Sequence, residues 1–136
     1  MAATLKLEIV TPEAKTYSED VDMVNLPGTH GDMGIYPNHV PLMTQITSGE
    51  IGVIQGGQEH FLAVGEGFVE ITGEKVAVLT DMAVKESDID EQAAEEARKR
   101  AEARLQEKLS DEELASVNAA LAHSLAQLKV KRRNRH

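Results

Sequence analysis

Histidine is the side chain of this sequence best suited to metal binding and to general acid–base catalysis, because the chain contains no cysteine. Its five histidines are His30, His39, His60, His123 and His136. No two of them have the three- to five-residue separation that is typical of histidines that share one zinc ion. The sequence therefore predicts no metal site, and it excludes a thiolate nucleophile.

The glycines and serines are placed no better for chemistry. Gly28, Gly31 and Gly34 match neither the phosphate-binding pattern G-x-x-x-x-G-K-[ST] nor G-x-G-x-x-G, and we expect no helix after them. No serine lies in the context of a nucleophile elbow, and the many carboxylates suit a solvated acidic surface. We expect a protein that is not an enzyme, in which these glycines serve tight turns with positive φ.

Charge and hydropathy restrict the partners. The net charge of −9 argues against a nucleic-acid footprint spread over the whole protein. The first residues, MAATLKLEIV, lack the basic-then-apolar layout of a secretory signal, and no apolar run approaches the roughly 20 residues that span a bilayer. We expect a soluble protein that meets a membrane only indirectly, through a partner.

The chain changes character near residue 86. Every glycine and proline lies before Glu74, whereas the sequence from Ile89 onward is dominated by Ala, Glu, Arg and Leu, which favour helices. We predict an α+β protein with an antiparallel β-sandwich over residues 1–86. A two-helix hairpin with a basic tail follows over residues 87–136.

The first part contains several short strands. Apolar and charged residues alternate in residues 5–9, LKLEI, as in a half-buried strand. The Gly-Gly pair within QGGQ joins residues 51–54 to 61–64, and TGEK joins residues 68–71 to 76–79. Both arrangements are typical of β-hairpins, so a sandwich or barrel of short antiparallel strands is expected.

The second part has two candidate helix starts. Ser87 with Asp90, and Ser110 with Glu113, both have the spacing of an N-terminal capping box. After each start, small or aliphatic residues recur every three or four positions, as on one face of a helix. The predicted stripes are Ile89, Ala93, Ala97, Ala101 and Leu105, then Leu114, Val117, Leu121, Leu125 and Leu128. Because alanine buries little area, we expect the hairpin to be weakly held.

Residues 28–42, GTHGDMGIYPNHVPL, combine glycines and prolines with apolar side chains. Pro37 and Pro41 fix φ and bias the residues before them toward extended conformations. A loop stiffened in this way loses little entropy when it docks on a partner. Alternatively, Met33, Ile35 and Tyr36 plug one end of the sandwich, and His39 is either a structural or a contact residue.

The same segment carries a resemblance to a known family. GDMGIYPNHVPLMTQITSGEIGV, residues 31–53, resembles the G-[ED]-x-G-[IV]-x-P-x-H-x-P signature of the ε subunit of F-type ATP synthases, called δ in mitochondria. VGEGFVEI at residues 64–71 resembles the last-strand motif of that family. VLTDMAV, followed by DID at residues 88–90, resembles its passage into the C-terminal helices.

The resemblance implies a rotor subunit that transmits torque and performs no chemistry. Its sandwich would bind the γ subunit of the central stalk, and one end would rest on the membrane-embedded ring of c subunits. In the family, the acidic position held here by Asp32 contacts the polar loops of that ring. The implied contact residues are Gly31, Asp32, Met33, Tyr36, His39 and Leu42.

The helical hairpin would be the regulatory element. In relatives it lies folded against the sandwich or extends along γ into the catalytic head of α and β subunits, where it inhibits ATP hydrolysis. We hypothesise that the basic tail contacts acidic surface on the β subunits; the alternative is a solvated tail without a partner. The residues concerned are Lys129, Lys131, Arg132, Arg133 and Arg135.

Some relatives bind ATP through [IL]-D-x-x-R-A at the start of the first helix. Here Ile89 and Asp90 match, and Arg100 and Arg104 fall where helical basic residues assist, but Ala93 replaces the motif arginine. A charge-assisted phosphate contact is worth about 1.5–3 kcal/mol. We therefore expect no cofactor and weak or absent ATP binding.

The resemblance also implies a location and leaves one competing function. The protein would be peripheral on the cytoplasmic face of a bacterial inner membrane, or on the stromal or matrix face in an organelle. The alternative is a stand-alone β-sandwich that binds a peptide or carbohydrate and dimerises through its helices. That alternative predicts a stable homo-oligomer with no affinity for γ.

Overall fold

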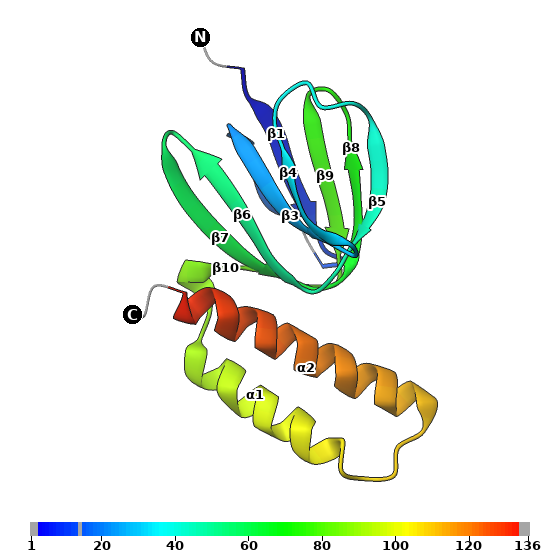
Figure 1. The fold of residues 1–136 in the computed structure, drawn as a ribbon. Coiled ribbons are helices and arrows are strands. Elements are labelled where there is room, and N and C mark those ends of the chain that lie inside the picture. Colours follow the sequence, from blue (N-terminus) through cyan, green and yellow to red (C-terminus); the bar gives the residue numbers. More distant parts are fainter. Residues whose placement is uncertain (1–2, 14, 134–136) are drawn as a thin grey trace.

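A computed structural model describes residues 3–13 and 15–133. Ten strands precede two helices (Figure 1). The strands are β1 (Leu5–Val10), β2 (Lys15–Val21), β3 (Met23–Gly28), β4 (Gly31–Ile35), β5 (Leu42–Ile46), β6 (Gly49–Gln55), β7 (Gln58–Val64), β8 (Gly67–Ile71), β9 (Lys75–Thr80) and β10 (Ala83–Lys85). A 3-10 turn, Glu86–Asp88, leads to α1 (Glu91–Arg104) and α2 (Asp111–Arg132).

The strands form one continuous sheet that folds over on itself into two layers. The strand order is β10-β7-β6-β3-β5-β8-β9-β1-β2, and β4 pairs with β3 outside this path. The two layers meet where β3 passes to β5 through the single pair Gly28 and Ile46. Most neighbours are antiparallel, as predicted, but β1 and β9 run parallel. The predicted class, a β-sandwich followed by two helices, is confirmed.

Alternation along the strands places the core between the layers. In β1, Leu5, Leu7 and Ile9 are buried while Lys6 faces water. Ile51 and Val53 of β6 lie in the same core. The Gly-Gly turn has φ of 58° and 80° at its two glycines, which matches a two-residue hairpin turn, and Gln55 pairs with Gln58 across it. β8 and β9 also pair antiparallel, so both predicted hairpins are present.

One expectation for the first part was wrong. Residues 31–35 are not a loop but β4, which is followed by β5 at residues 42–46. Residues 15–20, about which we made no prediction, form β2 along β1 together with Val21. The segment of residues 36–41 is the only part of the GTHGDMGIYPNHVPL stretch, apart from the turn at Thr29 and His30, that lies outside strands.

The starts of the two helices differ from each other. Ser110 accepts from the backbone N–H of Glu113, and the Glu113 side chain accepts from the N–H of Ser110, so this predicted capping box is confirmed. The box expected at Ser87 was wrong. Ser87 lies in the 3-10 turn, and Asp90 is the N-cap of α1, since its carboxylate accepts from the N–H of Ala93 at 3.0 Å.

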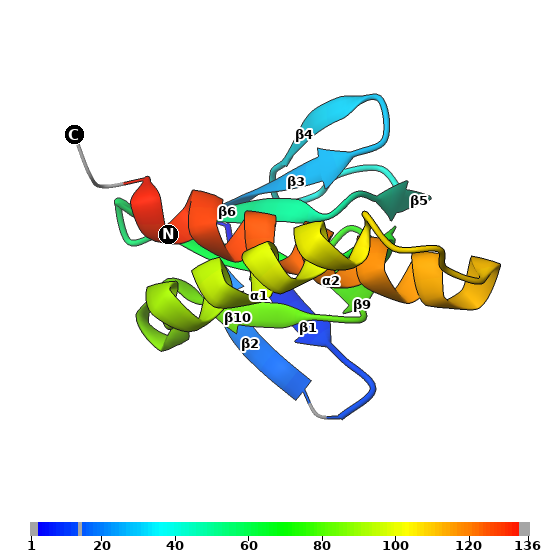
Figure 2. The ribbon, with the colours of Figure 1, turned by 90° about the horizontal axis from the view of Figure 1, so that it is seen from below.

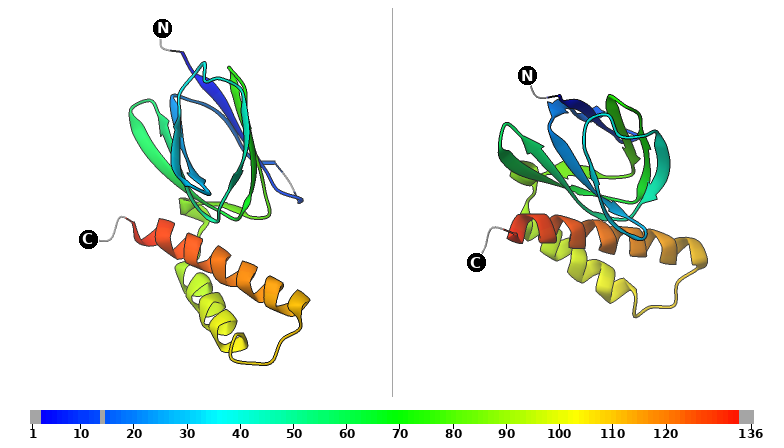
Figure 3. Two further views of the ribbon diagram at one scale, coloured as in Figure 1. Left: turned by 45° about the vertical axis from the view of Figure 1, so that its right-hand side comes forward. Right: turned by 45° about the horizontal axis from the view of Figure 1, so that its top comes forward.

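α2 lies between the sandwich and α1 (Figures 1 and 2). Two further views show the same arrangement, in which α1 lies on the side of α2 that faces away from the strands (Figure 3). The apolar contact of α2 with the sheet is small and consists of a cluster around β7. Its members are Ala63, Ile89, Ala126 and Val130, with Phe61, Met82 and Val84 beside them.

Because α2 is packed on two sides, its buried residues do not follow the predicted stripe. Val117 and Leu128 are buried as expected, but Leu114 and Leu125 are 40% and 48% exposed. On α1, Ala94 is buried and Ala93 is exposed. Neither helix of the described chain is long and apolar enough to cross a membrane.

Candidate functional site

The predicted contact residues lie at opposite ends of the sandwich. Gly31 and Asp32 follow the turn between β3 and β4, and both are exposed. Gly31 has φ of 124°, a conformation that a residue with a Cβ rarely adopts. This end also carries the β5–β6 turn, where Thr47 donates its backbone N–H to the carbonyl oxygen of Pro27. It is the end of the sandwich that faces α2.

Tyr36, His39 and Leu42 belong to the far end. The backbone N–H of Asn38 donates to the carbonyl oxygen of Gly73, in the turn between β8 and β9. His39 Nδ1 lies 2.6 Å from the carbonyl oxygen of its neighbour Val40. β4 separates the two ends by four steps of about 3.3 Å. The structure therefore divides the predicted set into two surfaces.

Apolar residues of the segment 28–42 divide between core packing and exposure to solvent, as the two alternatives for this segment require. Ile35 is buried in the sandwich core, and Met33 is partly buried against it. In contrast, Tyr36 is 63% exposed and Val40 is 71% exposed. The segment thus closes the core with some side chains and presents others to solvent.

Sequence reasoning missed three exposed apolar residues on the outer side of β5, β8 and β9. Met43, Phe68 and Leu79 are 67%, 53% and 55% exposed, and Phe68 pairs directly with Leu79. We call these three residues the outer apolar face. Alternation could have revealed it, because Val69 and Ile71 point into the core and must leave Phe68 on the opposite side.

The middle of α2 rests on the end of the sandwich that carries Asp32. The Ser48 hydroxyl lies 3.2 Å from the carbonyl oxygens of both Val64 and Ala122. His123 Nε2 lies 3.1 Å from Asp81 Oδ1. These polar contacts supplement the small apolar cluster under α2.

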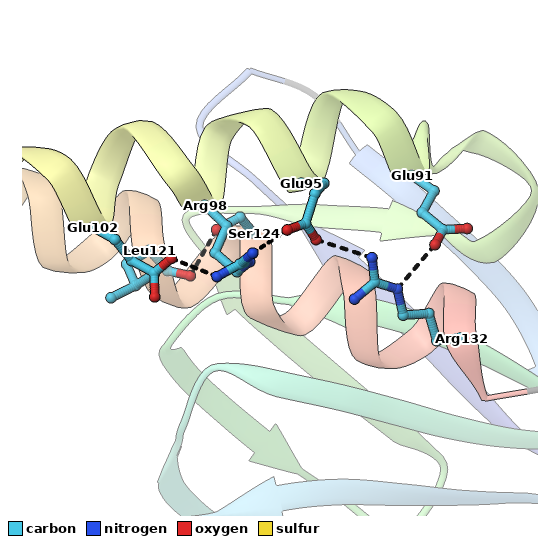
Figure 4. Close-up of polar contacts among 7 residues, drawn as sticks. All are labelled: Glu91, Glu95, Arg98, Glu102, Leu121, Ser124 and Arg132. Atoms are coloured by element: carbon cyan, nitrogen blue, oxygen red, sulfur yellow. Dashed lines mark hydrogen bonds and ion pairs between the residues drawn. The ribbon is translucent and has the colours of Figure 1, made fainter.

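The basic residues at the end of α2 turn toward their own chain in this conformation. Arg132 contacts Glu91 and Glu95 of α1, both at 2.9 Å (Figure 4). Lys131 Nζ donates to the carbonyl oxygen of Glu86. Arg133 pairs with Glu50 of β6, and Lys129 lies 3.9 Å from the same carboxylate. Arg135 lies outside the described residues.

Charge pairing perturbs the acid–base properties of the hairpin. Hydrogen bonds from Arg98, and then from Arg132, lower the pKa of Glu95 from 4.5 to about 2, although partial desolvation opposes the change. The same pairs with Glu91 and Glu95 raise the pKa of Arg132. Figure 4 shows that Arg98 also reaches Glu102 along α1. In the sandwich, burial raises the pKa of Tyr17.

The residues of the nucleotide motif are not gathered around one cavity. Ile89 is buried under α2, and Asp90 caps α1. Arg100 and Arg104 lie about 15 Å or more farther along the helix, given its rise per residue. They line an open cavity of about 550 Å³ where the helices diverge. Arg104 also contacts Glu113 at 3.3 Å.

No group of three or more histidine, aspartate or glutamate side chains that could hold a metal ion occurs among the described residues. The cavities of the sandwich are shallow. Those nearest the outer apolar face measure about 420 and 410 Å³, and both are lined by Glu66, Gly67 and Asp81. The arrangement is suited to docking another macromolecule rather than to enclosing a small substrate.

Two family models cover nearly the whole chain. Residues 4–86 match the β-sandwich domain of the ATP synthase delta/epsilon chain, and residues 87–132 match its long α-helix domain. An ATP synthase epsilon chain from Dehalococcoides mccartyi is 42% identical over 134 residues, which are 98% of this chain and 96% of that one. The epsilon chain of Halorhodospira halophila is 41% identical over 129 residues, 93% and 92% of the two chains.

Solved structures share the fold at lower identity. A chain of the Euglena gracilis mitochondrial ATP synthase superposes with a TM-score of 0.74 at 20% identity, covering 91% of this chain and 79% of that one. A chain from the central stalk and c-ring of the Tetrahymena thermophila enzyme gives 0.55 at 11% identity, covering 91% and 96%. None of these similarities supports a stand-alone sandwich module. The chain belongs to the ATP synthase delta/epsilon chain family, whose members are regulatory subunits of the rotor rather than catalytic subunits.

Proposed function

We propose that this chain couples rotation of the c-ring to the catalytic head by docking on the γ subunit through its outer apolar face. The observation that carries this proposal is the exposure of Met43, Phe68 and Leu79 on adjacent strands. Contiguous exposed apolar side chains are typical of a protein–protein interface. Family membership supports γ as the partner, since the relatives are chains of an ATP synthase.

Co-purification with γ tests this docking. Phe68→Glu or Leu79→Glu places a charge in the interface, so we expect γ to be lost from the purified complex. Leu125→Glu is a matched control, because Leu125 is exposed to a similar extent on α2, away from the strands. Retention of γ by both strand variants would exclude the outer apolar face as the docking surface.

The two ends of the sandwich are proposed to serve different partners. The resemblance assigns Asp32 to the polar loops of the c-ring, and the separation of Asp32 from His39 by the length of β4 supports a different neighbour for His39. We assign Tyr36, His39 and Leu42 to γ, together with the outer apolar face. Asp32→Cys and His39→Cys should then crosslink to c and γ respectively. Crosslinking of both positions to one subunit would contradict the assignment.

The helical hairpin is proposed to inhibit ATP hydrolysis when it leaves the sandwich and extends into the head. Its limited apolar contact with β7 supports a small free-energy difference between the two positions. The proposed contacts with acidic surface on the β subunits are those of Lys129, Lys131, Arg132, Arg133 and Arg135. Truncation after Leu128 should relieve inhibition, and unchanged hydrolysis would count against the hypothesis.

Charge neutralisation is a sharper test than truncation, because truncation also removes Val130, which is fully buried beside β7. Lys129→Gln combined with Lys131→Gln leaves this apolar contact in place. The double variant also loses the contacts of Lys129 with Glu50 and of Lys131 with the Glu86 carbonyl oxygen, which favours release of the hairpin. Faster ATP hydrolysis by the assembled enzyme is therefore expected from loss of the contacts with the head alone. The control is Lys99→Gln combined with Lys108→Gln, which removes two charges from α1 and the interhelical loop.

Nucleotide binding by this chain is proposed to be weak or absent. Ala93 stands in place of the motif arginine, and Asp90 already accepts a hydrogen bond as the N-cap of α1. The chain is expected to act without a cofactor and to reach the membrane only as a peripheral part of the assembly. Calorimetry with ATP tests the first statement, and tight binding would overturn it.

A further inference from the structure

Besides Val130 and Lys129, the guanidinium group of Arg133 contacts the sandwich at the end of α2. Arg133 Nε lies 3.1 Å from Glu50 Oε2, and Arg133 Nη2 contacts the other carboxylate oxygen. The same guanidinium lies over the ring of Phe61, 4.0 Å from its centroid. Arg133 therefore combines a two-point ion pair with a cation–π contact, each to a different strand.

The setting of Glu50 makes this pair stronger than an ordinary surface pair. The Glu50 side chain is 13% exposed and that of Arg133 is 37% exposed. An ion pair that is partly shielded from water is screened less by solvent and salt than one between exposed groups. The planar guanidinium also suits a two-point contact with carboxylate and stacking on an aromatic ring, neither of which lysine reproduces.

The apolar part of the interface between α2 and the sandwich is limited, so a polar contact can contribute to their association. The apolar side chains that α2 itself contributes are Ala126 and Val130, and they bury little area. The contact of Arg133 therefore adds to a few other polar contacts between α2 and the sandwich, which are those of Ser48 with Ala122, His123 with Asp81 and Lys129 with Glu50.

We propose that Glu50, Phe61 and Arg133 form a clamp that sets the equilibrium between the hairpin resting on the sandwich and the hairpin released from it. Only the expected effect of the clamp on ATP hydrolysis rests on the inhibitory role proposed above; the equilibrium itself does not. Arg133 cannot contact Glu50 and an acidic partner at the same time. Engagement of Arg133 by the head therefore requires the clamp to open, and opening the clamp makes Arg133 available.

A distance measurement on the isolated full chain tests the clamp directly. Because the chain has no cysteine, Gln58→Cys and Gln106→Cys introduce two unique spin-label sites, at the start of β7 and in the loop after α1. Double electron–electron resonance then reports whether the hairpin rests on the sandwich. Glu50→Gln, Phe61→Ala and Arg133→Gln should each raise the ratio of released to resting molecules about three- to tenfold.

Three comparisons make the result specific. Glu74→Gln removes the same charge from the far end of the sandwich and should leave the distances unchanged. Arg133→Lys keeps the charge but should still shift the ratio. About 1 M salt, at which the Debye length is about 3 Å, should release the hairpin more in the unmodified chain than in Glu50→Gln.

Arg133 lies at the end of α2, outside the sandwich, so we expect the sandwich to stay folded in Arg133→Gln. Unchanged distances in both Arg133→Gln and Glu50→Gln would overturn the clamp. ATP hydrolysis by the assembled enzyme separates this inference from the proposed function. Altered distances with stronger inhibition in Glu50→Gln support both. Altered distances with unchanged hydrolysis support the clamp and overturn the inhibitory role of the hairpin.

Discussion

The imidazole Nε2 of His123 lies 3.1 Å from Asp81 Oδ1, and this pair joins the middle of α2 to the loop between β9 and β10. The contact depends on Gly65, which lies beneath both side chains. A Cβ at Gly65 would stand 1.8 Å from Asp81 Oδ1 and 2.8 Å from His123 Nε2. The absence of a side chain at residue 65 is therefore a requirement of this His123–Asp81 pair.

Gly65→Ala should loosen the middle of α2 without unfolding the sandwich. The new methyl group displaces the end of the Asp81 side chain, which can rotate away and lose His123. We expect faster hydrogen exchange of the α2 amides near His123, while those of β6 and β7 stay protected. Gly73→Ala is the matched control, since no atom lies within 4 Å of a Cβ there. Equal exchange in the two variants would contradict this account.

Ser110→Ala should fray the first turn of α2. The substitution removes the hydroxyl that accepts from the Glu113 N–H, and an N-cap of this kind contributes about 0.5–2 kcal/mol. Amide exchange at residues 112–114 measures the loss, and residues 124–130 should be unaffected. Ser116→Ala, in an exposed position of the same helix, provides the comparison.

Local signals explain the parts of the fold that the sequence predicted. The Gly-Gly turn and the Ser110 capping box each depend on a few adjacent residues, and both are present. Pairing of β1 with β9 joins residues about 70 positions apart, and no local pattern records it. β4 was missed because Gly31 and Gly34 suggested a loop, although Met33 and Ile35 alternate with Asp32 and Gly34 as in a strand.

The candidate site was predicted in part. Asp32 and His39 stay predicted contact residues, but only the sheet shows that they belong to opposite ends of the sandwich. The outer apolar face was hidden because hydrophobic residues in strands are first assigned to the core. The basic tail was expected to be displayed to a partner, whereas Arg132 and Arg133 here pair with Glu95 and Glu50. Such pairs depend on tertiary packing, which composition does not reveal.

Leu125 and Leu128 make the difference between predicted and observed burial measurable. Both were assigned to one apolar stripe, but Leu125 is 48% exposed and Leu128 is 4% exposed. Leu128→Ala should lower the opening free energy of the hairpin by about 2–5 kcal/mol, as for a buried leucine. Leu125→Ala should change it by less than about 0.5 kcal/mol. Native-state hydrogen exchange of α2 measures both values, and similar losses would show that α2 packs differently.

The pairing of Glu95 with Arg98 and Arg132 predicts a dependence of the hairpin on acid. The hydrogen bond from Arg98, followed by that from Arg132, holds the pKa of Glu95 at about 2, below its ordinary value of 4.5. Because the pKa is lowered on folding, the stabilisation is fully present above about pH 4.5 and is lost as the pH falls toward 2.

Carboxyl chemical shifts of Glu95, followed by NMR over this range, measure the pKa directly. Glu95→Gln should remove this part of the acid dependence of α1–α2 contacts, whereas Glu96→Gln, at the neighbouring exposed position, should retain it. Titration of Glu95 near 4.5 would show that the two arginines do not hold its carboxylate in solution.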